Sequence, residues 1–248
     1  MKFILKAFLR RFGFEIYKVR LPPEVSSSHR KTLYKVEDFT VTSRTRLVSL
    51  INSVEYVISR NIEGDFVECG VWRGGSIMAI AQTLVDLGIK DRKIWLYDTF
   101  NGMTQPTIHD VAARSKKSAR DLLSKSKKIA GRNNIHAFAT INDVKANLLS
   151  IGYPMENFNF IIGPVEETLI ASAPESIALL RLDTDWYEST LTELVHLFPK
   201  VSLDGVIIID DFGDWEGSRK AVTEYFGNIE RSYLMNIIDS AGRLIIKN

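Results

Sequence analysis

Short apolar runs alternate along the chain with stretches in which apolar residues recur every three or four positions. Runs that are apolar almost throughout are typical of strands buried on both faces of a parallel sheet. Spacing by three or four is typical of helices that bury one face. The runs predict strands at 66–69, 93–98, 158–162, 178–183, 206–210, 233–238 and 243–247. The periodic stretches predict helices at about 44–60, from 76 onward, and at about 111–129, 142–150, 188–198 and 217–226.

Strands and helices that alternate in this way predict an α/β fold with a doubly wound, mostly parallel, Rossmann-like sheet. The last two strands are close enough in sequence to pair as a hairpin, which predicts an antiparallel edge strand. One domain is expected from about residue 39 to residue 248. Within it, a polar insertion at about 103–132 follows the second strand. An insertion of this length beside a strand end is often a helical lid over a substrate site.

The first twenty residues combine basic and apolar side chains at helical spacing. Lys2, Lys6 and Arg10 are four residues apart, with apolar residues between them. This pattern predicts a basic amphipathic arm, followed by a linker that ends at about residue 38. Lys6 interrupts the apolar part too early for a signal peptide. Two interpretations remain open: the arm lies on an anionic membrane surface, or it packs on its own domain or a sister subunit.

Composition narrows the class of protein. The 248 residues are 45% hydrophobic, which is enough for one large domain with a buried core. A net charge of +2 provides no overall attraction to nucleic acid. Cys69 is the single cysteine, so an intramolecular disulfide is excluded and a reducing, cytoplasmic location is expected. The sequence contains no run of about 18 apolar residues that would predict a transmembrane helix.

Three glycines, Gly70, Gly74 and Gly75, follow the first predicted strand and precede a helix. Glycine lets the backbone approach a ligand closely, and a helix N-terminus favours a nucleotide. Glu68 in the strand would repel a pyrophosphate, but it suits the ammonium group and hydroxyls of an amino-acid nucleoside. Ser76 stands at the expected N-cap of the helix. The alternative interpretation is a tight turn that binds no ligand.

Asp98 ends the second predicted strand, about thirty residues after the first. An acid at this place accepts hydrogen bonds from both hydroxyls of a ribose. The spacing therefore supports a nucleoside site more strongly than the glycines do alone. The alternative is a turn acid at a strand end.

Two pairs of aspartates follow later strands, Asp183 with Asp185 and Asp210 with Asp211. The carboxyl ends of parallel strands meet at one edge of a sheet, so these carboxylates are expected to converge. Carboxylates that meet in one crevice repel one another, and a divalent cation removes that repulsion. Oxygen ligands without histidine or cysteine favour Mg²⁺. The alternative is that these acids cap helices or pair with lysines.

The insertion is strongly basic. Its cationic side chains include Lys116, Lys117, Arg120, Lys125, Lys127, Lys128 and Arg132. Such a segment could bind an acidic acceptor, or it could be a solvated helical face.

Four segments, taken together, resemble the macrocin O-methyltransferase family. They are the glycine turn at 64–76, Tyr-Asp-Thr-Phe-Asn-Gly-Met at 97–103, Leu-Asp-Thr-Asp-Trp-Tyr-Glu-Ser-Thr at 182–190 and Ile-Asp-Asp-Phe-Gly-Asp-Trp-Glu-Gly at 209–217. The resemblance extends from about residue 39 to the C-terminus. Enzymes of this family use S-adenosylmethionine and Mg²⁺ to methylate sugar hydroxyls in antibiotic pathways.

The resemblance implies roles for individual residues. Those expected around the methionine part of S-adenosylmethionine are Glu68, Gly70 and Ser76, with Asp98 at the ribose and Val165 and Glu166 at the adenine. The expected metal ligands are Asp183, Asp210 and Asp211, and the expected general base is Asp185.

The expected function is thus Mg²⁺-dependent transfer of a methyl group to a sugar hydroxyl of a glycan, a nucleotide sugar or a glycosylated metabolite. The expected partners are that acceptor and a second copy of the chain, with the amphipathic arm as a further contact to the inner face of the membrane. Two alternatives use the same fold: a nicotinamide-dependent oxidoreductase and a non-catalytic nucleotide-binding partner in glycan assembly. A nucleic-acid methyltransferase is disfavoured because Thr184-Asp185-Trp186-Tyr187 replaces the proline-rich aromatic motif of that class.

Overall fold

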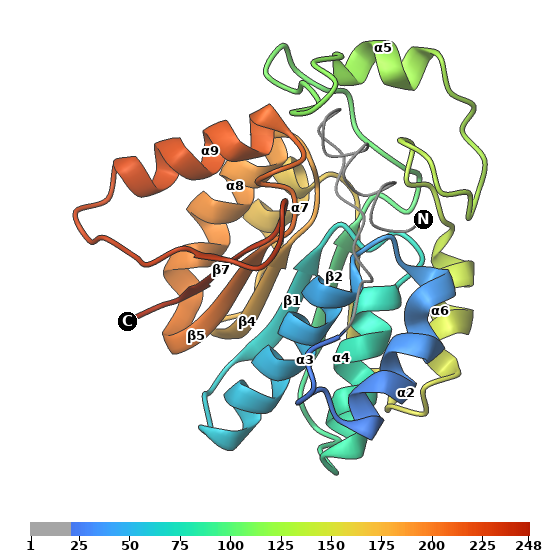
Figure 1. Ribbon diagram of the computed structural model, residues 1–248, viewed down its shortest axis with the longest axis vertical. Helices are drawn as coiled ribbons and strands as arrows, with labels where there is room; N and C mark the ends of the chain where they lie inside the picture. Colours follow the sequence, from blue (N-terminus) through green and yellow to red (C-terminus); the bar gives the residue numbers. More distant parts are fainter. Residues whose placement is uncertain (1–20) are drawn as a thin grey trace, which may run out of the picture.

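The computed structural model describes residues 21–248 (Figure 1). The amphipathic arm predicted at 1–20 lies outside the described residues. Within the described part, no helix is both long enough and apolar enough to cross a bilayer.

A single seven-stranded sheet forms the centre of the molecule, in the order β3-β2-β1-β4-β5-β7-β6. The strands are β1 (Asp65–Cys69), β2 (Ile94–Asp98), β3 (Phe158–Ile162), β4 (Ile177–Leu182), β5 (Val201–Ile209), β6 (Asn236–Ile237) and β7 (Arg243–Ile246). The first five are parallel, whereas β7 runs antiparallel to both β5 and β6. The strand order reverses between β1 and β4, and ligands of such sheets bind at the carboxyl ends beside this point. The predicted doubly wound sheet and its antiparallel hairpin are confirmed.

Helices cover both faces of the sheet (Figure 1). The helices of the described residues are α2 (Ser27–Val36), α3 (Arg44–Ser59), α4 (Gly75–Asp86), α5 (Ala119–Ser124), α6 (Ile141–Leu149), α7 (Val165–Ala171), α8 (Tyr187–Leu197) and α9 (Glu216–Gly227), with 3-10 turns at Glu37–Phe39, Met155–Asn157 and Phe198–Lys200. Helices α2, α3, α4 and α6 lie on one face, and α7, α8 and α9 lie on the other (Figure 1).

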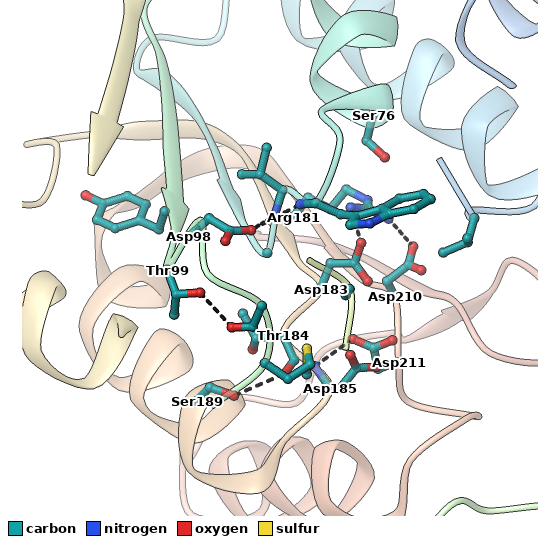
Figure 2. A pocket seen from close by; sticks show the side chains of 18 of the residues that line it. Ser76, Asp98, Thr99, Arg181, Asp183, Thr184, Asp185, Ser189, Asp210 and Asp211 are labelled. Atoms are coloured by element: carbon teal, nitrogen blue, oxygen red, sulfur yellow. Dashed lines mark hydrogen bonds and ion pairs between the residues drawn. The ribbon is translucent and has the colours of Figure 1, made fainter. Parts of the chain in front are cut away.

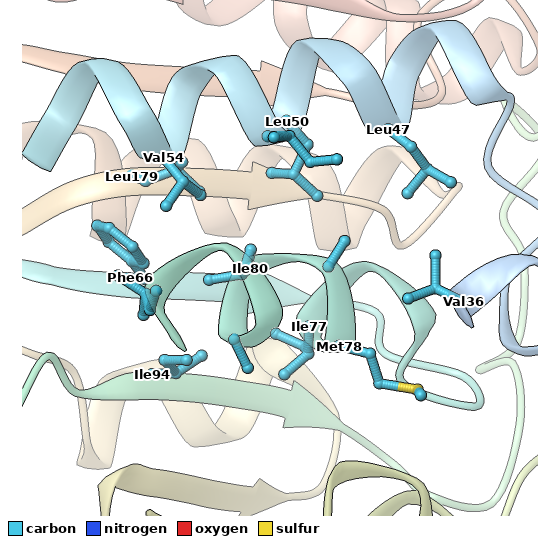
Figure 3. Close-up of a cluster of buried hydrophobic side chains, with 14 of the residues drawn as sticks. Val36, Leu47, Leu50, Val54, Phe66, Ile77, Met78, Ile80, Ile94 and Leu179 are labelled. Carbon is cyan, nitrogen blue, oxygen red and sulfur yellow. The ribbon is translucent and has the colours of Figure 1, made fainter. Parts of the chain in front are cut away.

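Side chains on the two faces of the sheet belong to two separate hydrophobic clusters. Phe66 of β1 and Leu179 of β4 pack against α3 and α4, where Leu50 and Ile80 are buried (Figure 3). The neighbouring residues in the same strands, such as Val67, point into the cluster beneath α7, α8 and α9. Because both faces are buried, the strands have few polar residues, which is why their sequence signal is strong.

The structure differs from the sequence-based expectation before residue 39. Ser26 is an N-cap whose hydroxyl accepts a hydrogen bond from the His29 amide, and it begins α2 where a linker was predicted. Leu33 and Val36 of α2 are buried against α4. The linker prediction for this segment is therefore wrong, because a serine run can begin a helix as well as interrupt one.

Three further boundaries differ. Gly74, rather than Ser76, is the N-cap of α4, so Ser76 lies inside the first turn. The strand predicted at 233–238 is reduced to the two residues of β6. The helix predicted at 111–129 is reduced to α5, because the preceding residues form bridges instead.

The insertion is anchored at its start. Asp110 is fully buried and accepts hydrogen bonds from the Thr107 amide at 2.6 Å and the Tyr187 amide at 2.8 Å. Ala112 forms a bridge to Trp215, and the Trp186 indole donates to the Thr104 carbonyl oxygen at 3.2 Å. The part of the insertion up to residue 118 is thus tied to the ends of β4 and β5, while α5 extends above the sheet (Figure 1).

Candidate active site

A pocket lies at the carboxyl ends of the parallel strands, where the topology predicts a ligand. The turns after β1, β2, β3, β4 and β5 all contribute to its wall. Asp98 stands on one side of it, and Asp183, Asp210 and Asp211 stand on the other (Figure 2). The insertion contributes Met103 and Thr104, and the loop that follows it contributes Asn133 and Asn134. Every predicted site residue except Glu68 lines this pocket.

The glycine turn is built for close backbone contact. Gly70 has φ +83°, and a Cβ atom there would lie 1.9 Å from the carbonyl oxygen of Asp183. The turn after β1 therefore rests directly on the end of β4, which only glycine permits. Ser76, in the first turn of α4, is nearly fully buried in the pocket wall.

Asp98 holds the glycine turn in place. Its Oδ2 accepts hydrogen bonds from the amides of Val71 at 2.7 Å and Trp72 at 3.1 Å, and its Oδ1 accepts one from Phe100 at 2.6 Å. Burial raises the pKa of Asp98, and these three amides oppose the rise. The structure thus gives Asp98 a role in shaping the turn in addition to its place in the pocket wall.

Glu68 lies behind the pocket wall. Its side chain is buried and paired with Arg181, the residue opposite it in the register of β1 and β4. Burial raises the pKa of Glu68 although Arg181 lowers it. Arg181, not Glu68, reaches the pocket surface. The predicted contact of Glu68 with the methionine part of a cofactor is therefore not supported by its position.

The predicted metal ligands converge. Oxygen atoms of Asp183, Asp210 and Asp211 all lie within 4.8 Å of one another. Asp185 lies beside them, and its amide donates to Asp211 Oδ2 at 3.1 Å. The backbone of Asp185 is left-handed, with φ +66°. Few residues other than glycine adopt this conformation; aspartate does so more readily than most, and such residues are concentrated at functional sites.

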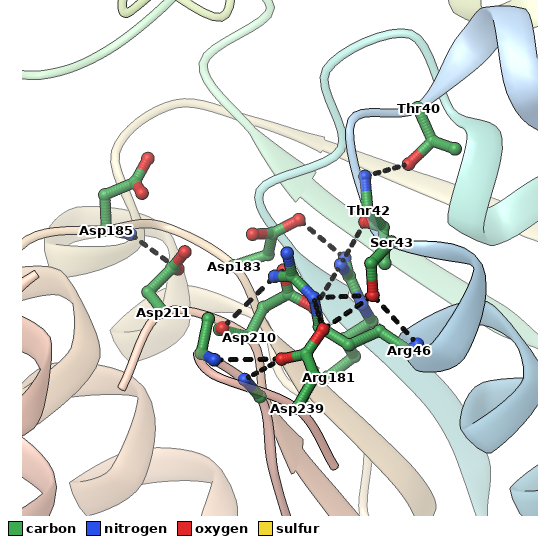
Figure 4. Close-up of polar contacts among 12 residues, drawn as sticks. Thr40, Thr42, Ser43, Arg46, Arg181, Asp183, Asp185, Asp210, Asp211 and Asp239 are labelled. Atoms are coloured by element: carbon green, nitrogen blue, oxygen red, sulfur yellow. Dashed lines mark hydrogen bonds and ion pairs between the residues drawn. The ribbon is translucent and has the colours of Figure 1, made fainter. Parts of the chain in front are cut away.

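Two arginines, which the sequence motifs did not indicate, organise this acidic wall (Figure 4). Arg181 is 1% exposed and pairs with Glu68, with Asp183 at 2.7 Å and with Asp210 at 2.7 Å. Arg46 of α3 pairs with Asp210 and with Asp239 at 3.2 Å. A charged residue within the apolar run of β4 was the available signal for Arg181. Nothing local identifies Arg46, since its partners are distant in sequence.

The arginines do not neutralise the wall. The carboxyl groups that they meet or adjoin are those of Glu68, Asp183, Asp185, Asp210, Asp211 and Asp239. Burial, together with neighbouring carboxylates, raises the pKa of Asp183 to about 6 and that of Asp185 to about 7. The pKa of Asp211 is also raised, by burial and then by Asp185. A surplus of carboxylates with converging oxygens fits a divalent cation.

The chain matches a protein-family model over most of its length. A family model described as macrocin-O-methyltransferase (TylF) matches residues 7–245. The match begins well before residue 39, where the sequence motifs placed the start of the resemblance. It includes α2, which agrees with the packing of that helix on α4.

Curated relatives cover most of the chain. The demethyldecarbamoylnovobiocin O-methyltransferase of Streptomyces niveus is 32% identical over 227 residues, which cover 87% of this chain and 82% of the relative. The 8-demethyl-8-(2,3-dimethoxy-alpha-L-rhamnosyl)-tetracenomycin-C 4'-O-methyltransferase of Streptomyces olivaceus is 33% identical over 203 residues. These residues cover 82% of this chain and 73% of the relative.

Solved structures share the fold. The structure of the O-methyltransferase NovP has a TM-score of 0.71 and 29% identity, and the alignment covers 84% of this chain and 82% of that chain. A calicheamicin methyltransferase has a TM-score of 0.60 at 17% identity, over 92% of this chain and 94% of that one, which shows a shared fold alone.

Proposed function

Starting from the fact that this chain belongs to the macrocin-O-methyltransferase (TylF) family, we propose that it methylates a sugar hydroxyl with the help of a magnesium ion. The chain is an S-adenosylmethionine-dependent O-methyltransferase. The observation that carries the finer proposal is the convergence of Asp183, Asp210 and Asp211 next to Asp185, in the pocket that the glycine turn also lines.

The cofactor side of the pocket is proposed to be the wall formed by the turns after β1, β2 and β3. Gly70 and Ser76 line the part assigned to the methionine, and Asp98 lines the part assigned to the ribose. Val165 and Glu166, at the start of α7, line the part assigned to the adenine. S-adenosylmethionine supplies an electrophilic methyl group, while the protein supplies position and electrostatics.

The acidic wall fits a magnesium site by the chemistry of its donors. Asp183, Asp210 and Asp211 would hold the ion, and Arg181 and Arg46 fix the orientation of two of these three carboxylates. An ion held there lowers the pKa of a neighbouring hydroxyl and neutralises the negative charge that develops on its oxygen.

Asp185 is the proposed general base. It lies in the pocket wall beside the three ligands, and it accepts the proton of the attacking hydroxyl on a carboxylate oxygen. It lies in the turn between β4 and α8, where its backbone is left-handed. The hydrogen bond from its amide to Asp211 fixes the base beside the proposed metal ligands.

The raised pKa values predict how magnesium binding depends on pH. Asp183 and Asp185 favour their neutral forms in the fold, so the stability from these groups is present below their ordinary pKa and is lost as pH rises through about 6 to 7. The ion needs ionised ligands, so it replaces the lost stability only at the higher pH. We expect about 5 mM Mg²⁺ to raise Tm by about 3 °C or more at about pH 8, and by less than about 1 °C at about pH 5.5.

Calorimetric unfolding of the purified chain measures this effect, with Asp211→Asn and Asp86→Asn as a matched pair of variants. Asp86 ends α4, at the far end of that helix from the pocket. The magnesium effect should shrink in Asp211→Asn, which loses one negative charge but keeps an oxygen donor, and should persist in full in Asp86→Asn. An equal Tm rise at both pH values, or in both variants, would contradict a site at these aspartates.

The acceptor is proposed to be a sugar, since the relatives named above include an enzyme for a rhamnosyl-tetracenomycin. Family membership favours this over the nicotinamide oxidoreductase and the non-catalytic partner considered from the sequence. Homodimer formation and membrane contact of residues 1–20 stay predictions.

The insertion supports an acceptor that carries negative charge. Between residues 111 and 132 there are eight basic side chains and a single acid, Asp121. Among carboxylates of residues 21–248, one lies within salt-bridge distance of this basic set, Glu216 beside Lys116. The loop that follows lines the pocket at Asn133 and Asn134. A sugar bound to a phosphate or diphosphate would place its anionic group against this basic segment.

Charge reversal tests the acceptor proposal. Lys117→Glu with Arg120→Glu is expected to raise the acceptor KM about tenfold or more at low ionic strength, without changing the affinity for S-adenosylmethionine. The matched control is Lys90→Glu, an exposed lysine before β2 at the opposite end of the strands. An acceptor KM that is the same in the double variant and in Lys90→Glu would argue for a neutral acceptor.

A further inference from the structure

Glu193 is a buried carboxyl group that the proposed reaction does not use. It lies on the inner face of α8 and is 0% exposed. Its Oε1 accepts a hydrogen bond from the Thr184 hydroxyl at 2.8 Å. Its Oε2 is buried without a hydrogen-bond partner among the described residues. A carboxyl group in such a place needs an explanation, because its burial costs stability.

The surroundings of Glu193 favour its neutral form. Among residues 21–248, no lysine, arginine or histidine lies within salt-bridge distance of it. Burial is the largest cause that raises the pKa of Glu193, and the acids Glu166, Asp183 and Asp185 raise it further. A neutral carboxyl group accepts the Thr184 hydrogen bond without adding charge to an already acidic site.

Thr184 occupies the position between the first metal ligand and the base (Figure 2). Asp183 precedes it at the end of β4, and Asp185 follows it with a left-handed backbone. The carbonyl oxygen of Thr184 accepts from the Trp186 amide at 2.7 Å and from the Ser189 hydroxyl at 3.4 Å. Among the described residues, its hydroxyl is fixed by Glu193. Two side chains of α8 therefore hold the turn: Glu193 through the Thr184 hydroxyl at 2.8 Å, and Ser189 through a longer bond to the Thr184 carbonyl oxygen.

We propose that Glu193 is a positioning residue that acts through its hydrogen bond with Thr184 to hold Asp185 in its left-handed conformation. This role goes beyond the ligands and the base, and it rests on the proposed function only for its effect on turnover. The effect on the turn itself does not depend on any acceptor. A left-handed conformation of this kind persists only where surrounding contacts fix it. The hydrogen bond between Thr184 and Glu193 of α8 is one of these contacts.

Three variants separate positioning from a requirement for a carboxyl group. Thr184→Val removes the hydroxyl and keeps the shape of the side chain. Glu193→Leu removes both carboxyl oxygens, and its Tm is expected to equal or exceed that of wild type because a buried oxygen without a partner is lost. Glu193→Gln retains a neutral acceptor of the same length and serves as the matched control.

Hydrogen exchange of residues 183–187, read by mass spectrometry, gives the direct measure of the turn. We expect exchange about tenfold faster in Thr184→Val and Glu193→Leu, and exchange within about twofold of wild type in Glu193→Gln. The kcat should fall about tenfold or more in the first two variants, with unchanged affinity for S-adenosylmethionine and little change in acceptor KM. The double variant should be no worse than either single variant, because both remove the same interaction.

Two results would overturn the proposal. One is exchange and turnover within about twofold of wild type in Thr184→Val, which decides the question even where Glu193→Leu does not fold. The other is a loss in Glu193→Gln as large as that in Glu193→Leu, which would mean that an ionisable group is needed. Failure of the proposed function is distinguishable, since wild type would then transfer no methyl group while the exchange differences remained.

Discussion

Asp185→Asn is expected to lower kcat by about three orders of magnitude, within the range attributed to a positioned general base. The amide of asparagine has nearly the shape of the carboxylate but does not accept a proton at neutral pH. Asparagine also tolerates a left-handed backbone, so the φ of +66° at this position should be retained. Affinity for S-adenosylmethionine, measured by calorimetry, should stay within about threefold of wild type, because the glycine turn is untouched.

The chain offers a matched control for Asp185→Asn. Asp204 is also an aspartate with a left-handed backbone, at φ +62°, and it lies in the first half of β5, away from the carboxyl ends of the strands. Asp204→Asn should change kcat by less than about twofold. A kcat for Asp185→Asn within about tenfold of wild type would mean that another group accepts the proton.

Arg181→Met is expected to destabilise the protein by about 3–5 kcal/mol, since it leaves buried carboxylates without their cation. The arginine is 1% exposed and pairs with Glu68, Asp183 and Asp210. Methionine fills most of the volume, so the loss reports charge rather than a cavity. In thermal unfolding, a loss of this size lowers Tm by about 10 °C in a chain of this length.

The stability loss should be much smaller for an arginine whose ion pair is equally short but exposed to solvent. Arg44 contacts Glu37 at 2.6 Å, with 47% and 43% of the two side chains exposed. Arg44→Met should cost less than about 1 kcal/mol because solvent screens the pair. Adding Glu68→Gln to Arg181→Met should recover part of the loss, because it removes one of the buried carboxyl groups that have lost their partner. Equal losses in Arg181→Met and Arg44→Met would show that the buried network contributes no more than a surface pair.

The sequence predicted the parts of the fold that depend on local patterns. Strands buried on both faces, such as β1 and β4, have apolar runs that are hard to mistake. By contrast, α2 was missed because Ser26 is both a turn residue and a helix N-cap, and the choice depends on the burial of Leu33 and Val36 against α4. The helix predicted across the insertion is shortened because Ala112 bridges to Trp215, about a hundred positions away, while Val111 bridges to Ser118.

In the candidate site, too, the features set by local sequence were predictable, whereas contacts between distant residues were not. Strand ends predicted that Asp183, Asp185, Asp210 and Asp211 converge, because topology places them at one edge of the sheet. The contacts that orient them were not predictable from spacing. Arg46 is one of these, since it reaches Asp210 from α3. The place of Glu68 was not predictable from its motif either, because an ion pair with its cross-strand partner Arg181 buries it behind the pocket wall.

Transfer of a labelled methyl group tests the central claim most directly. The purified protein would be incubated with methyl-labelled S-adenosylmethionine and a fractionated extract of the source organism, with Mg²⁺ or with a chelator, alongside Asp185→Asn. The account predicts label in a sugar-containing fraction, either a glycolipid, a polysaccharide or a small glycosylated molecule. That label should be lost with the chelator and in the variant. Label in protein or nucleic acid, or label in sugar that survives the chelator, would contradict it.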